Sequence, residues 1–258
     1  MYKLVTKAIK NANRVCVFTG AGISVESGIP PFRGKDGLWS KYDPTFLNIT
    51  YFHQRPKESW ILIKEIFYDF FGQAKPNAAH YVLAALEQKG MMQATITQNI
   101  DNLHYEAGSK TVYEFHGTSQ YLVCEKCRKR YHVSEINLGN LPPLCKSCGH
   151  VLKPDFVFFG EPIPEHTNTL SFHEAEVADV FILIGTTGEI MPASMIPHVA
   201  KKRGAMIIEV NPKESNYTKN ITDVFIQAKA TEAVPRLAQQ VGLHDFFDRQ
   251  EGTHEGQN

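Results

Sequence analysis

The sequence lacks an excess of charge of either sign, and it lacks a long apolar run. Among its 258 residues, 27 Lys and Arg side chains balance 27 Asp and Glu side chains. A balanced charge argues against a broad electrostatic surface for nucleic acid or for an anionic membrane. No apolar run approaches the roughly 20 residues that a membrane-spanning helix needs. We therefore expect no membrane partner and no strong nucleic-acid signal.

The N-terminal residues also lack the apolar core and the small-residue cleavage site of a signal peptide. Cysteine is scarce, with five residues in the chain. We expect these cysteines to be mostly reduced in an intracellular, cytoplasmic protein. The length allows one large domain, or one domain with a small partner.

The sequence does contain a glycine-rich turn after a short apolar run at 15–18, which predicts a buried strand. Gly20 and Gly22 are separated only by Ala21. Such a turn lets the backbone approach a phosphate, whose charge the following N–H groups can stabilise. Glycines also mark ordinary turns, so the spacing alone is weak evidence. With the preceding strand, it predicts a nucleotide-binding site.

The residues after this turn depart from the usual dinucleotide fingerprint. Pro30 and Pro31 prevent a regular helix, and Phe32 and Arg33 follow them directly. On a stiff loop beside a phosphate, the ring can shield a reactive carbon from water and the guanidinium can hold phosphate. The alternative is a stiff loop with one packed Phe and one solvated Arg.

The strongest pattern is a pair of Cys-x-x-Cys motifs separated by residues 128–144. Two such pairs can complete a tetrahedral zinc site, and four protein ligands leave no open position for catalysis. The sequence predicts one structural Zn²⁺, with disulfides as the alternative that a reducing compartment disfavours. Cys16, in the first strand, is expected to be a core residue. The predicted metal ligands are Cys124, Cys127, Cys145 and Cys148.

Basic side chains surround the first of these motifs. Lys126, Arg128, Lys129 and Arg130 follow one another closely. A solvated face is the simpler interpretation, and contact with nucleic acid or an acidic partner is the alternative.

Polar side chains follow two further predicted strands. Gln98, Asn99 and Asp101 come after the run at 94–97, and His116 follows the run at 112–115. Ligands of open α/β sheets bind at the carboxyl ends of strands, although Asn and Asp there can equally cap helices. A histidine can accept a proton from a sugar hydroxyl near neutral pH. The chain has 11 histidines, so the residue type alone does not select one.

Together, the segments 20–34, 98–108 and 116–117 resemble the signature of the sirtuins, the NAD-dependent protein deacylases. The resemblance covers nearly the whole chain. Pro31 departs from it, because the family more often has Asp or Thr there. The resemblance implies that the acyl oxygen of a modified lysine attacks C1′ of the nicotinamide ribose and that nicotinamide leaves. His116 then deprotonates a ribose hydroxyl, and the products are free lysine and O-acyl-ADP-ribose.

The resemblance also implies roles for individual residues. His116 and Asn99 are expected to be catalytic, Gln98, Asn99 and Asp101 to contact the nicotinamide and its ribose, and Asn211 to contact the adenosine ribose. The segment 228–230 resembles the adenine-side loop, with alanine where the family usually has glycine. The expected NAD-binding residues are Gly20, Ala21, Gly22, Glu26, Phe32, Arg33, Gln98, Asn99, Ile100, Asp101, Gly185, Thr186, Thr187, Asn211, Lys229 and Ala230.

The segment 153–161 resembles the part of the family that pairs with an acyl-lysine peptide as an added strand. The alternative is an ordinary core strand. Relatives that remove acidic acyl groups carry a Tyr-x-x-Arg pair, and Ile63 and Ile66 stand at the matching positions, so we expect acetyl or longer apolar acyl groups. The alternative for Ile63 and Ile66 is simple core packing, without a role in lining an apolar substrate channel. The expected substrate-binding residues are Ile63, Ile66, Val157, Phe158, Phe159, Gly160 and Glu161.

About seven apolar strands alternate with helical stretches, which predicts an α/β fold with a doubly wound, parallel, Rossmann-like sheet. The large domain is expected to comprise 1–34, 73–118 and 152–247. Residues 35–72 and 119–151 would form a small domain from a helical module and a zinc ribbon, and 248–258 a flexible tail.

Two other functions use the same features. The chain can be a protein mono-ADP-ribosyltransferase, or a non-catalytic NAD-sensing zinc-ribbon binding module. The presence of Asn99, Asp101 and His116 argues against an inactive site.

Overall fold

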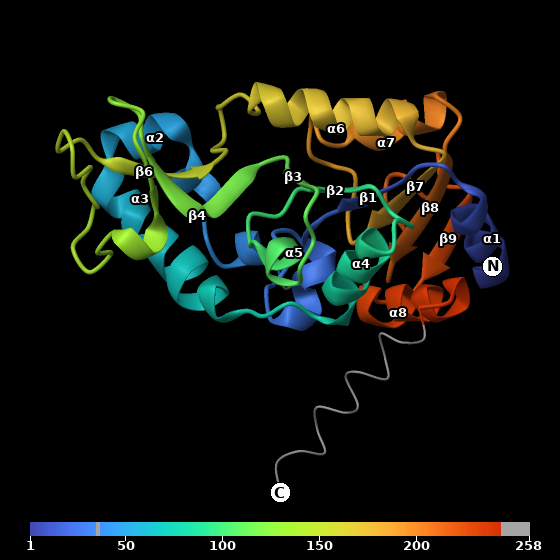
Figure 1. Ribbon diagram of the computed structural model, residues 1–258. Coiled ribbons are helices and arrows are strands. Elements are labelled where there is room, and N and C mark those ends of the chain that lie inside the picture. The colour runs from blue at the N-terminus through green and yellow to red at the C-terminus, as the bar shows by residue number, and fades with distance from the viewer. Residues whose placement is uncertain (35–36, 244–258) are drawn as a thin grey trace, which may run out of the picture.

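A computed structural model describes residues 1–34 and 37–243 of the chain (Figure 1). The tail predicted over 248–258, and the last residues of the predicted large domain, lie outside the described residues. No helix in the described ranges is long and apolar enough to cross a membrane.

A six-stranded sheet, parallel throughout, lies at the centre of the larger part of the molecule. Its strands are in the order β3-β2-β1-β7-β8-β9. This order reverses direction between β1 and β7, as in doubly wound folds, and the predicted Rossmann-like sheet is confirmed. The strands are β1 (Val15–Thr19), β2 (Ala94–Thr97), β3 (Val112–Glu114), β7 (Val180–Ile184), β8 (Met206–Asn211) and β9 (Val224–Gln227).

Helices cover both faces of this sheet, which explains why β1 and β7 are buried at every position. Successive side chains of a strand point to opposite faces. Val17 accordingly packs with one apolar cluster, and Phe18 packs with another. In Figure 1, α6 and α7 lie over one face and α4 and α8 over the other. The helices of this part are α1 (Tyr2–Asn11), α4 (Ala78–Gln88), α5 (Leu103–Glu106), α6 (Glu165–Val177), α7 (Met195–Lys202) and α8 (Ala230–Val241).

A second, three-stranded antiparallel sheet has the order β5-β4-β6. Its strands are β4 (Gly117–Cys124), β5 (Arg130–His132) and β6 (Leu152–Phe156). One of the seven strands expected from the sequence is β6, and it pairs with β4 instead of joining the parallel sheet. The small sheet therefore includes residues on both sides of the expected insertion at 119–151.

The helical module packs directly on this small sheet. It contains α2 (Ile49–Gln54), α3 (Pro56–Ile63) and a π-helix (Lys64–Phe70) that continues α3. The indole N–H of Trp60 donates to the carbonyl of Leu152 at 2.8 Å. The helical module and the small sheet thus share one core, in which Phe52, Trp60, Phe67, Phe156 and Phe158 are buried. Short 3₁₀-helices complete the connections at Ala21–Ser27, Leu38–Ser40, Pro44–Leu47, Phe71–Gln73 and Val133–Glu135.

The four cysteines of the two motifs converge at one end of the small sheet. Their sulfur atoms all lie within 4.8 Å of one another. The Sγ–Sγ distances are 3.5 Å for Cys124 and Cys148 and 3.6 Å for Cys127 and Cys145. Tetrahedral zinc, with Zn–S bonds of about 2.3 Å, places its sulfurs about 3.8 Å apart. The residues therefore fit a structural zinc ion, as predicted.

We expect Cys124→Ser to lower the zinc content from about one ion per chain and to lower the melting temperature, because the binding energy of a structural zinc is also folding energy. Elemental analysis and thermal denaturation measure the two effects. Cys16→Ala is the control, because Cys16 lies in β1 and should leave the zinc content unchanged. Full zinc content in Cys124→Ser would contradict the four-thiolate site.

Candidate active site

Two glycine turns meet at the point where the strand order reverses. Gly22 N donates to the carbonyl of Gly185 at 2.9 Å, which joins the turn after β1 to the turn after β7. A Cβ on Gly22 would lie 2.5 Å from the Cα of Gly185. Gly185 has φ +63°, and a Cβ there would lie 2.4 Å from Ile23 N. Both positions therefore require glycine, and the chain approaches itself closely where ligands of such folds bind.

The polar side chains that follow β2 form hydrogen bonds with both of these turns. Gln98 Nε2 donates to Thr186 Oγ1 at 2.9 Å, across the strand ends. Asn99 is buried, and its Nδ2 donates to the carbonyl of Gly20 and to Ser24 Oγ, both at 3.2 Å. Four of the residues expected to bind the cofactor thus take part in these hydrogen bonds: Gly20, Gln98, Asn99 and Thr186.

Asp101 is joined to the same group through Ser24, whose hydroxyl donates to Asp101 Oδ2 at 2.7 Å. Burial raises the pKa of Asp101, and the hydrogen bonds from Ser24 and from Leu103 N act against this shift. Ile100, between Asn99 and Asp101, faces the other way and belongs to the small-domain core.

His116 lies in the turn just before β4, beside this polar group. Its Nδ1 is 2.9 Å from the carbonyl oxygen of Gln98. A carbonyl oxygen can only accept, so Nδ1 carries the proton and Nε2 keeps its lone pair. Burial lowers the pKa of His116 below the ordinary value of 6.5, and the hydrogen bond to Gln98 opposes this shift. The lowered pKa favours the neutral imidazole near pH 7, which is the form that a general base needs.

One end of the segment expected to bind substrate, at Val157, is held by His116. Val157 N donates to the carbonyl of His116 at 2.8 Å. On the other side, Phe159 N donates to the carbonyl of Leu47 at 2.9 Å, and Ile49 N donates to the carbonyl of Phe159 at 3.0 Å. The segment is therefore held between the base and the helical module.

Side chains of this segment divide between core and surface. Phe158 is buried, whereas Phe159 is 45% exposed. Glu161 accepts from Phe158 N at 2.8 Å and pairs with the buried Lys153 at 2.9 Å. Gly160 has φ +94°, which favours glycine. The expected residues Ile63 and Ile66 are 0% and 1% exposed and lie in the small-domain core.

The far end of the glycine turns is lined by β8 and by the start of α8. Asn211 Nδ2 donates to the carbonyl of Thr186 at 2.7 Å, and the carbonyl of Thr187 accepts from Asn216 N at 3.0 Å. Lys229 precedes the first residue of α8, Ala230.

Two ion pairs bridge expected cofactor residues to neighbouring segments. Lys229 Nζ is 3.5 Å from Glu26 Oε1. Arg33 Nη1 is 3.2 Å from Glu189 Oε2, with both side chains 45% exposed. Phe32, beside Arg33, packs on Trp39 with ring centroids 5.4 Å apart. The loop of Phe32 and Arg33 is thus anchored on both sides.

Sequence reasoning missed a group of buried residues behind Asn99. Ser24 stands in the glycine motif but was not predicted as a site residue, and its hydroxyl also lies 3.5 Å from His80 Nε2. Burial lowers the pKa of His80 to about 4, and it lowers that of the neighbouring His104. Burial also raises the pKa of Glu114, in β3, to about 7. Ser24 could have been found from its place in the motif, but the others follow no recognisable pattern.

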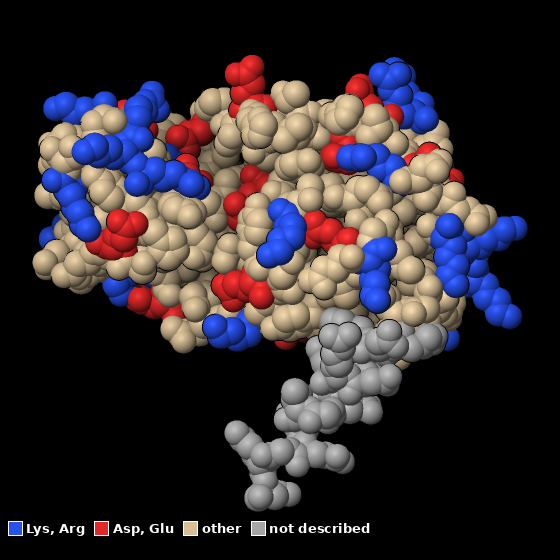
Figure 2. All heavy atoms as spheres, in the orientation of Figure 1, with Lys and Arg blue, Asp and Glu red and all other residues tan. Residues whose placement is uncertain are grey.

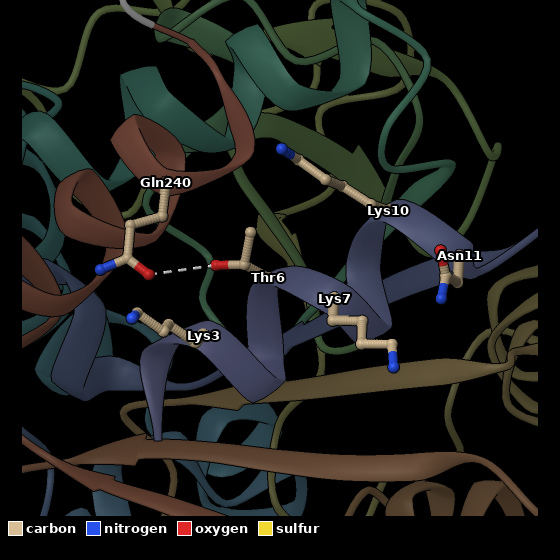
Figure 3. A pocket seen from close by; sticks show the side chains of 6 residues that line it. All are labelled: Lys3, Thr6, Lys7, Lys10, Asn11 and Gln240. Carbon is tan, nitrogen blue, oxygen red and sulfur yellow. Dashed lines mark hydrogen bonds between the residues drawn. The ribbon is translucent and has the colours of Figure 1, made fainter.

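Surface features away from this site do not form a comparable arrangement. A shallow pocket of about 450 Å³ between α1 and α8 is lined by Lys3, Lys7 and Lys10, among others (Figure 3). The ammonium groups of Lys7 and Lys10 point away from each other, so these lysines do not converge on one anion.

Basic side chains also gather at the end of the molecule that carries β4 and β6 (Figure 2). Of the basic residues in the first cysteine motif, Arg130 pairs with Asp155 at 2.6 Å and lies 3.6 Å from the centre of the Tyr121 ring. The guanidinium of Arg130 therefore already has partners within the chain.

Comparison with known proteins agrees with this arrangement. The family model described as "Sir2 family" matches residues 20–192. NAD-dependent protein deacetylase 1 of Pyrobaculum aerophilum is 45% identical, over 85% of this chain and 86% of its own length. The NAD-dependent protein deacylase of Pyrococcus furiosus is 42% identical, over 92% of this chain and 96% of its own.

Solved structures agree as well. A Sir2 homologue bound to ADP-ribose has a TM-score of 0.89 at 38% identity, covering 93% of this chain and 96% of that one. A Sir2 complex with a p53 peptide and NAD⁺ has a TM-score of 0.87 at 33% identity, covering 94% and 99%. Because both the sequence and the fold match along nearly their full length, this chain belongs to the Sir2 family and is an NAD-dependent protein deacylase.

Proposed function

We propose that the chain removes acetyl and longer apolar acyl groups from protein lysine side chains, in the cleft between a large domain (1–34, 73–118 and 152–247) and a small one (35–72 and 119–151). The observation that carries this proposal is the neutral imidazole of His116, held by the carbonyl of Gln98 beside Asn99 and Asp101. A base of this kind suits the removal of a proton from a ribose hydroxyl. The names of the relatives favour deacylation over ADP-ribosyl transfer to proteins and over a binding-only role.

NAD, when bound, supplies the ribose that accepts the acyl group and the nicotinamide that leaves. The residues present fit such a molecule, because the two glycine turns meet at the strand ends and the polar side chains of Gln98 and Asn99 reach both turns. Arg33 can hold a phosphate through charge-assisted hydrogen bonds. Asn99 and Asp101 lie at the other end, where the nicotinamide ribose would reach His116. Asn211, Lys229 and Ala230 would contact the adenosine side of the molecule, whereas Ile100 lies in the small-domain core.

The segment 157–161 suits an extended acyl-lysine peptide. Among the described residues, the carbonyl of Val157 and the N–H of Gly160 have no hydrogen-bond partner. An added strand can use both groups, and such backbone pairing does not depend on the peptide's side chains. The partners would therefore be acyl-lysine proteins or peptides of varied sequence.

We expect His116→Ala to lower turnover by about 10²- to 10⁴-fold, because that is the usual contribution of a general base. Affinity for NAD should be largely kept. Steady-state kinetics and calorimetric titration measure the two quantities. The control is His173→Ala, because His173 is an exposed histidine on α6 and should leave both unchanged. Near-normal turnover in His116→Ala would remove His116 from its role.

The rate should also depend on pH through His116. The base works only when neutral, so kcat/KM should be fully developed above its pKa and fall as the pH drops through it. Burial lowers this pKa in the free protein, which places the midpoint below 6.5. A pH profile of kcat/KM tests the expectation, because that ratio reports groups of the free enzyme, and a midpoint above 6.5 would contradict it.

The acyl preference should exclude acidic groups. Ile63 and Ile66 provide no cation, and they lie in an apolar core with Phe156 and Phe158. An unpaired carboxylate entering such surroundings would lose its hydration. We expect a peptide with acetyl-lysine to be turned over far faster than the same peptide with succinyl-lysine, as measured by kcat/KM. Efficient desuccinylation would show that this preference is wrong.

A further inference from the structure

The ion pair between Arg33 and Glu189 links two loops at the mouth of the active site. Arg33 follows the proline-stiffened loop, and Glu189 lies four residues after Gly185, whose carbonyl binds the first glycine turn. Arg33 also lines a groove with Trp39 and Phe159, beside the segment expected to bind substrate. The pair therefore lies between the proposed phosphate site and the proposed peptide site.

The pair is of a kind that a ligand can displace. One Arg33 nitrogen contacts one Glu189 oxygen at 3.2 Å, and both side chains are 45% exposed. Exposed pairs of this type contribute little to stability, because water screens both charges. A guanidinium binds phosphate with two parallel hydrogen bonds, which is a stronger arrangement. A phosphate group can therefore replace the carboxylate.

We propose that Glu189 is an internal competitor for the guanidinium of Arg33 and that it thereby sets the affinity for NAD. The proposal rests on the proposed role of Arg33 as a phosphate ligand. In the free protein the carboxylate occupies the guanidinium, and it must be displaced when the dinucleotide phosphate binds. Glu189 also places a negative charge beside that phosphate. The repulsion between the two negative charges weakens binding further.

A merely structural role predicts the opposite sign. If the pair served only to hold the Phe32–Arg33 loop in place, its loss would loosen the site and weaken dinucleotide binding. Competition predicts instead that loss of the Glu189 charge strengthens binding. The direction of the change thus separates the two roles.

The test is Glu189→Gln, with ADP-ribose binding measured by calorimetry and with the KM for NAD and kcat measured at saturating acetyl-lysine peptide. We expect the Kd for ADP-ribose to fall by about two- to fivefold, which corresponds to the energy of an exposed ion pair. The KM for NAD should fall in parallel, and kcat should stay within a factor of about two. Glu189→Asp keeps the charge and should show a smaller change than Glu189→Gln.

The matched control is Glu176→Gln. Glu176 pairs with Arg203 at 3.1 Å, is 44% exposed and lies at the end of α6, away from the glycine turns. The same loss of one charge there should leave the Kd for ADP-ribose unchanged, which excludes an effect of net charge alone.

A further variant, Arg33→Gln, separates the proposal from the function on which it rests. If Arg33→Gln weakens ADP-ribose binding while Glu189→Gln leaves it unchanged or weakens it, the competition is wrong and Arg33 remains a phosphate ligand. If neither variant changes the Kd, Arg33 is not a phosphate ligand, and the competition falls with it. Tighter binding in Glu189→Gln that disappears in the double variant with Arg33→Gln supports the proposal.

Discussion

The close approach of two backbone turns is the constraint on which the rest of the site depends. Gly22 and Gly185 touch through a hydrogen bond of 2.9 Å, and neither position has room for a Cβ. This contact joins β1 and β7 where the order of the parallel strands reverses. The polar residues that follow β2 then come within hydrogen-bond reach of both turns, as Gln98 does with Thr186 and Asn99 with Gly20. The cofactor site is thus a consequence of strand order and glycine placement.

His116 connects this site to the small sheet. Its ring is held by the backbone of Gln98, at the end of β2, and its own carbonyl holds Val157, just after β6. His116 therefore has two positioning roles. Its ring is held beside the expected NAD-binding residues, and its backbone holds the peptide-binding segment next to that ring. Burial favours the neutral imidazole by lowering its pKa, whereas the hydrogen bond that positions the ring acts in the opposite direction. The zinc-binding cysteines contribute to the active site indirectly, because they stabilise the small sheet that carries this segment.

The sequence was informative where chemistry is tied to local spacing. The glycine turn, the polar group after β2 and the Cys-x-x-Cys pairs could be predicted because each depends on residues close together in the chain. The π-helix at Lys64–Phe70 could not, because apolar spacing does not distinguish it from an α-helix. The contact of Ser24 with His80 and the ion pair of Arg33 with Glu189 join segments that only the fold brings together. For the same reason, the direction of each pKa shift was beyond sequence reasoning.

The central claim is that this site transfers an acyl group from lysine to the ribose of NAD. Mass spectrometry of an acetyl-lysine peptide incubated with the purified protein, with and without NAD, tests it most directly. The account predicts loss of acetyl only when NAD is present, together with nicotinamide and O-acetyl-ADP-ribose in equal amounts. Failure to convert acetylated or longer-chain acylated peptides, in a preparation that binds NAD, would contradict it.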